Sequence, residues 1–128
     1  MKSKKQIGVW MDHSVAHLTE QKDNNSMTTH NIKSKFTHYE KEHSVRQSES
    51  LMHNKEHHLQ AEYYKQIAGA LAGHEEILLF GPTKAKEELS HLLKANHQFA
   101  GASIVLKHAD KMNEQQQQAF VKEHFDLL

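Results

Sequence analysis

The chain lacks cysteine, and its 128 residues include one proline and five glycines. Without cysteine there are no disulfide bonds and no thiolate metal sites, and a reducing compartment is favoured, so we expect a cytoplasmic protein. No apolar stretch approaches the length needed to span a membrane or to form the core of a signal peptide. We therefore expect a soluble protein without a membrane partner.

Arginine is almost absent as well. The 16 basic residues balance 16 acidic ones, and Arg46 is the one arginine among them. A net charge of zero gives no general attraction to nucleic acid, and a single guanidinium leaves little for bidentate recognition of phosphates or bases. The 13 histidines would make the surface cationic below about pH 6.

Alternating apolar residues near the N-terminus predict an antiparallel meander. Residues 6–12 and 14–20 read as two strands joined by a tight turn at Asp12, and residues 26–33 read as a third, more polar strand. Trp10 is predicted to lie on the opposite face of the first strand from three apolar residues: Ile7, Val9 and Met11.

Helices and strands alternate in the second half. A helix is expected from about Lys55 to Gly73, then a buried strand at 75–80, a helix with Thr83 as N-cap, a strand at 102–108 and a helix from Asn113. The predicted inward residues are Leu59, Tyr63, Ile67 and Leu71 in the first helix, Ala85, Leu89, Leu92 and Leu93 in the second, and Phe120, Val121 and Phe125 in the third.

The resulting order, β-β-β-α-β-α-β-α, predicts an α/β fold with a ribonuclease H-like mixed five-stranded sheet. We expect one domain over residues 1–128. It would contain a polar, histidine-rich loop at about 33–54, which is either mobile or partly helical.

The segment "GPTKAK" (81–86) follows a predicted strand and opens a predicted helix. A phosphate-binding P-loop needs several glycines, whereas this turn has Gly81 followed by a proline. We interpret it as a strand-to-helix turn with two outward lysines, Lys84 and Lys86, which leaves weak contact with an anion open.

The sequence gives little support for a metal-dependent reaction. Two-metal nucleases need several converging carboxylates. Asp12 stands at a suitable strand end, and Glu56 or Glu62 could come from the first helix. The strand that ends at Gly81 brings none, however, and Asp110 lies beyond the last strand. A turn role is therefore favoured for Asp12. The candidate metal ligands are His13, His17, His53 and His57, with His13 and His17 expected on one side of a strand. The chain has no cysteine nucleophile and no evident Ser-His-Asp grouping, so the sequence does not indicate a covalent catalyst.

Three segments in order carry a resemblance: "GVWMDHSVAHL" (8–18), "AEYYKQIAGALAGHEEILLFGPTKAKEEL" (61–89) and "DKMNEQQQQAFVKEHF" (110–125). Together they resemble the small bacterial translational machinery proteins related to the central domain of Pelota and of archaeal and eukaryotic class-1 release factors. The resemblance implies a ribonuclease H-like fold and an association with translation. Release factors act through a Gly-Gly-Gln loop, whereas residues 35–58 here contain no glycine, so peptide release is not expected.

We expect a non-enzymatic, translation-associated accessory protein that contacts the ribosome or RNA and needs no cofactor. The expected contacts, mostly with phosphate and sensitive to salt, are Lys41, Arg46, Gln47, Lys55, Lys84 and Lys86. The alternatives are a module that binds another protein and, less favoured, a histidine-rich metal-binding protein or a metal-dependent hydrolase.

Overall fold

The computed structural model describes residues 5–21, 27–34 and 49–126, and for 49–56 it describes the backbone alone. Five strands form one mixed sheet in the spatial order β3-β2-β1-β4-β5. Strands β1, β4 and β5 run parallel, whereas β2 is antiparallel to both of its neighbours. The strands are β1 (Gln6–Met11), β2 (Val15–Gln21), β3 (Met27–Lys33), β4 (Glu76–Gly81) and β5 (Ser103–His108). The predicted ribonuclease H-like α/β class is confirmed.

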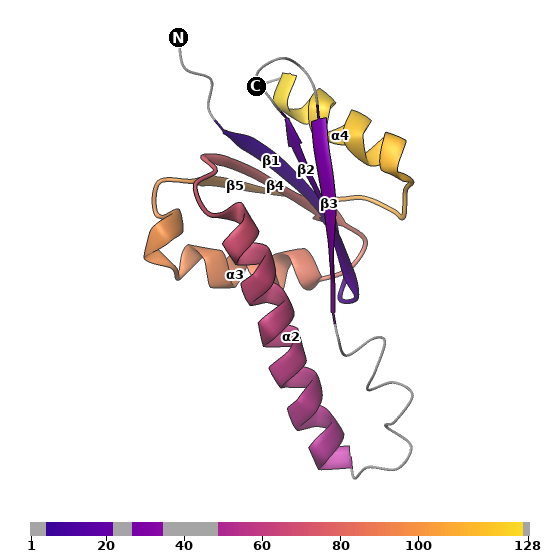
Figure 1. Ribbon diagram of the computed structural model, residues 1–128, viewed down its shortest axis with the longest axis vertical. Helices are drawn as coiled ribbons and strands as arrows, with labels where there is room; N and C mark the ends of the chain where they lie inside the picture. The colour runs from indigo at the N-terminus through magenta and orange to yellow at the C-terminus, as the bar shows by residue number, and fades with distance from the viewer. Residues whose placement is uncertain (1–4, 22–26, 35–48, 127–128) are drawn as a thin grey trace.

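The helices lie on both faces of this sheet (Figure 1). α2 (Glu49–Leu71) and α3 (Ala85–Lys94) cover one face, and α4 (Glu114–Asp126) covers the other. A short 3-10 turn, η3 (His97–Phe99), joins α3 to β5. Among the described residues, no helix combines the length and apolar character that crossing a membrane requires.

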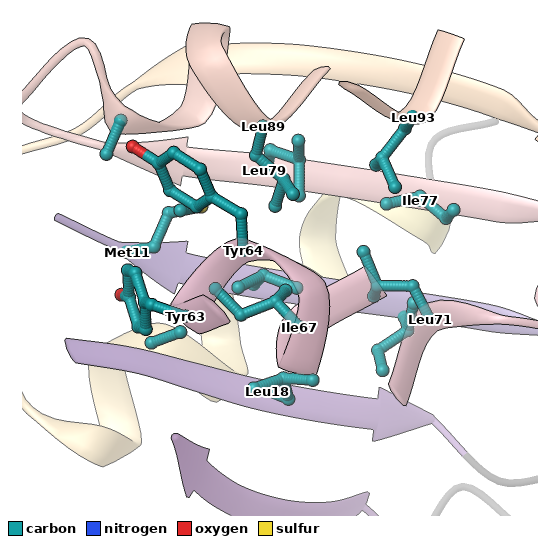
Figure 2. Packing of buried hydrophobic residues seen from close by; sticks show 14 of the residues in the cluster. Met11, Leu18, Tyr63, Tyr64, Ile67, Leu71, Ile77, Leu79, Leu89 and Leu93 are labelled. Carbon is teal, nitrogen blue, oxygen red and sulfur yellow. The ribbon is translucent and has the colours of Figure 1, made fainter. Parts of the chain in front are cut away.

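Two apolar clusters hold the layers together, one on each side of the sheet. The larger cluster joins β1, β2 and β4 to α2 and α3 through Met11, Leu18, Tyr63, Ile67, Leu71, Leu79 and Leu89 (Figure 2). The smaller one joins the other face to α4 through Trp10, Leu78, Phe80, Val121 and Phe125. Burying each large apolar side chain contributes about 1.5–3 kcal/mol. Trp10 thus lies opposite Val9 and Met11, as the alternation predicted.

Several predicted boundaries shift. α2 begins at Glu49 rather than near Lys55, so the last residues of the expected polar loop are helical. At the other end of that loop, Lys33 closes β3 and Ser34 is buried. Residues 35–48 lie outside the described part of the chain.

The caps of α3 and α4 differ in how well they were predicted. Asn113 and Gln116 exchange hydrogen bonds of 2.8 and 2.9 Å between side chain and backbone, which confirms the expected capping box of α4. The N-cap of α3 is Lys84 rather than Thr83, although the Thr83 hydroxyl still accepts a bond from the Ala85 N–H. Leu92 was expected to face inward, but 52% of it is exposed.

Gly81 lies at the end of β4, close beside the end of the paired strand β1. Its φ is +154°, and a Cβ added at this position would lie 2.1 Å from the backbone oxygen of Met11. Because the clashing atom belongs to a central strand, it cannot move aside as the tip of a side chain could. The lack of a side chain therefore allows the "GPTKAK" turn to begin directly beside the end of β1.

Replacing Gly81 by Ala should lower the free energy of unfolding by about 2 kcal/mol or more, because a backbone clash adds to an unfavourable φ. Urea denaturation followed by circular dichroism measures this change. Gly101→Ala is the matched control, since its added Cβ meets nothing within 4 Å. Equal stability of the two variants would contradict the close approach to Met11.

His124 is a buried imidazole on the sheet-facing side of α4. It is 8% exposed and packs edge-on against Phe125, with ring centres 4.9 Å apart. Burial, followed by the positive charge of Lys107, lowers the pKa of His124, and Glu76 acts weakly in the opposite direction. The folded protein therefore favours the neutral ring.

Because the unfolded chain protonates this histidine at a higher pH than the folded chain, stability should fall as the pH drops below the ordinary histidine pKa of about 6.5. The loss should stop growing below the lowered pKa of the folded state. His124→Leu should lose less unfolding free energy than the parent between about pH 7.5 and 5, as measured by urea denaturation at each pH.

The solvent-exposed His97 provides the control for this comparison. His97→Leu should keep nearly the pH dependence of the parent chain. A pH dependence in His124→Leu equal to that of the parent would contradict the role given to burial.

Candidate functional site

The parallel strands β1, β4 and β5 bring three chain turns to one edge of the sheet. β1 ends at Met11 beside the end of β4, and β5 ends beside Gly81. In α/β sheets, ligands commonly bind beyond the carboxyl ends of parallel strands. The turn between β1 and β2 and the turn between β4 and α3 both lie at this edge.

Asp12 builds the first of these turns. Its Oδ1 accepts hydrogen bonds from the N–H groups of Ser14 at 2.7 Å and Val15 at 2.9 Å. Its carbonyl oxygen accepts a bond of 2.9 Å from the Tyr63 hydroxyl. Asp12 is therefore the turn residue that the sequence favoured, and it is tied to α2 by a buried phenol.

Glu88 is the centre of a second polar group beside that turn. Its Oε1 accepts a hydrogen bond of 2.5 Å from the Tyr64 hydroxyl and lies 3.2 Å from His13 Nε2. Glu88 belongs to α3, Tyr64 to α2 and His13 to the β1–β2 turn, so one carboxylate oxygen connects three elements. In Figure 2 the hydroxyl oxygens of Tyr63 and Tyr64 lie at the same end of the apolar cluster.

A cavity of about 540 Å³ opens at this group. Its lining comes from the β1–β2 turn, α2 and α3, and consists of His13, His57, Gln60, Ala61, Tyr64, Glu88 and Leu92. The Gln60 side chain acts on the Tyr64 hydroxyl from close by, yet its buried Nε2 has no hydrogen-bond partner of normal geometry. The cavity is therefore polar at its base and carries an unsatisfied donor.

The pKa values of the Tyr63 and Tyr64 hydroxyls are both raised well above that of an ordinary tyrosine. Burial is the largest cause that raises the pKa of Tyr63, and the Asp12 carboxylate and Tyr64 add to it. Burial also raises the pKa of Tyr64, with the hydrogen bond and negative charge of Glu88 as the next causes. Both hydroxyls are therefore held as neutral donors rather than as proton acceptors.

The predicted phosphate contacts differ in accessibility. Lys84 is exposed at the N-terminus of α3, but Lys86 is 6% exposed and its Nζ donates to the Thr83 carbonyl at 2.6 Å. The expectation that both lysines point outward is wrong for Lys86, because α3 begins at Ala85 and turns position 86 inward. Lys41, Arg46 and Gln47 lie outside the described residues, as does the side chain of Lys55.

Two of the histidines proposed as metal ligands, His13 and His17, lie on different sides of the sheet. His13 turns toward Glu88 on the α3 side. His17 lies on the α4 side, where its ring centre is 5.7 Å from that of Trp10 and its Nδ1 is 2.6 Å from Asn31 Oδ1. The prediction that both occupy one side is wrong because the turn at Asp12 re-aims His13. His57 lines the cavity with His13, and the side chain of His53 lies outside the described part.

The described carboxylates do not gather at this edge either. The Asp110 side chain lies beyond β5 near His108, at 3.6 Å, and both groups are exposed. Among the residues that the structure describes, no three histidine or carboxylate side chains are grouped to hold a metal ion. The two-metal nuclease interpretation thus gains no support from the described residues.

Sequence reasoning missed Glu88, Tyr64 and Gln60. Their signal was faint: Tyr64 is adjacent to a predicted core tyrosine, and Glu88 precedes Leu89 in the predicted inward stripe. Nothing in the spacing indicates that a turn far away in the sequence would deliver His13 to the same carboxylate.

No protein-family model and no curated protein sequence matches the chain. Two solved structures are similar to the chain. The Pelota protein of Thermoplasma acidophilum matches with a TM-score of 0.59 at 15% identity, over 98% of this chain and 32% of that one. Archaeoglobus fulgidus Pelota matches with a TM-score of 0.60 at 10% identity, over 96% of this chain and 32% of that one.

The fold is Pelota-like. The expected structural resemblance is confirmed at the level of the fold, since the likeness spans nearly the whole chain. The chain spans about a third of the length of these Pelota proteins. Membership of the bacterial translational machinery group stays a prediction.

The raised pKa values predict that neither Tyr63 nor Tyr64 ionises in the folded protein up to about pH 11, where an ordinary tyrosine is mostly ionised. The double variant Tyr63→Phe/Tyr64→Phe should therefore show the same rise in tyrosinate absorbance as the parent in the folded state. In urea, the same substitutions should remove two of the three tyrosines' contributions. A reduced rise in the folded double variant would contradict the burial of these phenols.

Proposed function

We propose that this chain is a translation-associated accessory protein that contacts the ribosome or RNA without catalysing a reaction. The observation that carries the proposal is the Pelota-like fold over nearly its whole length. The ordered segments that resemble the Pelota and release-factor central domain point the same way. Cytoplasmic localisation follows as part of this proposal.

A release mechanism does not fit the chain. The segment ahead of the long helix lacks glycine throughout, and Gln47 stands between Arg46 and Ser48. A loop that presents glutamine to an ester needs the backbone freedom that neighbouring glycines provide. We therefore propose binding rather than peptide hydrolysis as the function.

The shape of α2 supports a contact role. The helix has 23 residues, about 34 Å, whereas β1 has six, about 20 Å. Among residues 57–71 of α2, the buried residues lie between Tyr63 and Leu71, and His57 and His58 are exposed. Figure 1 shows the N-terminal half of α2 extending past the sheet. This projecting half would carry Lys55 toward a partner.

The proposed phosphate contacts are the basic residues that the sequence indicated, apart from Lys86. Lys84 is exposed, and Lys41, Arg46 and Lys55 complete the set, with Gln47 among them. Lysine ammonium groups bind phosphate mainly through charge, so the contact would depend on salt and be largely blind to sequence. We omit Lys86 from this surface because its ammonium is bonded inside the protein.

Sucrose-gradient sedimentation of the tagged protein in cell lysate tests the proposal. The parent chain should migrate with ribosomal particles at low salt and leave them as salt is added. Lys84→Glu should lower the bound fraction and reduce the slope of log affinity against log salt by about 1, because one phosphate contact is lost.

Lys122→Glu is the matched control. It makes the same charge change at an exposed position of α4, on the other face of the sheet, and should bind like the parent. A parent protein that stays at the top of every gradient would refute the proposed function. Equal losses in the two variants would refute the location of the contact.

A further inference from the structure

We propose that the cavity at Glu88 binds a basic side chain, an arginine, of a partner protein. This site lies between α2, α3 and the β1–β2 turn and does not depend on contact with RNA. Its size, about 540 Å³, falls in the range of about 300–1,000 Å³ in which proteins bind small groups.

The charge of the cavity selects the sign of the ligand. Of the seven lining residues, Glu88 is the one that carries a formal charge at neutral pH with histidine neutral. Both neighbouring donors act on the same carboxylate oxygen, since Tyr64 and His13 each face Oε1. Within the described part of the chain, Oε2 is thus left to accept a hydrogen bond from a cation.

The hydrogen bond from Tyr64 also fixes the position of that carboxylate. A buried phenol holds Oε1 at 2.5 Å, so Glu88 is oriented although its side chain is half exposed. Orienting a group before binding reduces the entropy that binding costs. Glu88 therefore differs from an ordinary surface carboxylate such as its neighbour Glu87, which does not line the cavity.

Gln60 indicates that the ligand offers an acceptor as well as a cation. Its buried Nε2 lies close to the Tyr64 hydroxyl but has no hydrogen-bond partner of normal geometry among the described residues. An unpaired buried donor is costly, and a ligand oxygen would remove that cost. A residue in a peptide has both groups: its side chain would donate to Glu88, and its backbone carbonyl would accept from Gln60.

The walls suit the stem of a long basic side chain. Ala61 and Leu92 line the opening, and Leu92 is 52% exposed, as one of two large apolar residues left open to solvent among those described. Long cationic side chains bury their methylene groups against apolar surface while their charged end is paired. Arginine is favoured over lysine because its guanidinium is more weakly hydrated and so is less costly to bury at an interface.

The test is a titration of the full ¹⁵N-labelled chain with a blocked Gly-Arg-Gly peptide, followed by amide chemical shifts. Shifts should saturate at His13, Ala61 and Leu92. The same peptide with citrulline in place of arginine keeps the shape of the side chain and loses its charge. It should bind at least about tenfold more weakly, because a charge-assisted hydrogen bond is lost.

Glu88→Gln should also weaken binding of the arginine peptide about tenfold, whereas Glu87→Gln, the adjacent exposed carboxylate, should leave it nearly unchanged. Equal effects of the two substitutions, equal binding of the two peptides, or the absence of saturating shifts would overturn the proposal. The comparison of peptides uses the parent chain, so it decides the question even if Glu88→Gln fails to fold.

Discussion

The arrangement of the whole molecule depends on how closely other elements approach β1. This strand pairs with β2 on one side and with β4 on the other. Gly81 lies close against the Met11 backbone at the paired ends of β4 and β1, and the bare Cα of Gly8 leaves room for Val121 of α4, whose methyl carbon would lie 2.3 Å from an added Cβ. Two glycines thus set the distances between β1, the β4–α3 turn and α4, and these distances position the rest.

That packing determines the geometry at the edge of the sheet where β1, β4 and β5 end. Because the end of β4 lies against the end of β1, α3 starts beside the Asp12 turn, and Glu88 comes within reach of His13. Tyr63 and Tyr64, adjacent on α2, then bond separately to the turn and to α3. A close backbone contact in the core therefore determines which polar groups meet at the surface.

Much of the fold could be predicted from sequence because it is written in local periodicity. The alternation around Trp10, the capping box at Asn113 and the apolar spacing of Tyr63, Ile67 and Leu71 each act within a few residues. The site could not be predicted in the same way. His13 and Glu88 are 75 positions apart, and their meeting depends on strand order and on the approach at Gly81. Lys86 was misplaced because it lies on the buried side of α3 with Ser90 and Leu93, and its ammonium donates to the Thr83 carbonyl.

The unequal packing of α2 couples its helicity to whatever it touches. The turns between Tyr63 and Leu71 are stabilised by the core, whereas the side chains of His57 and His58, nearer to the projecting end, are exposed. Helical turns without tertiary packing are only marginally stable in water. A partner that binds the projecting turns would therefore supply part of their folding free energy, and its own binding free energy would be weakened by the same amount. Substitutions that favour helix formation in these turns would then tighten binding without adding a contact.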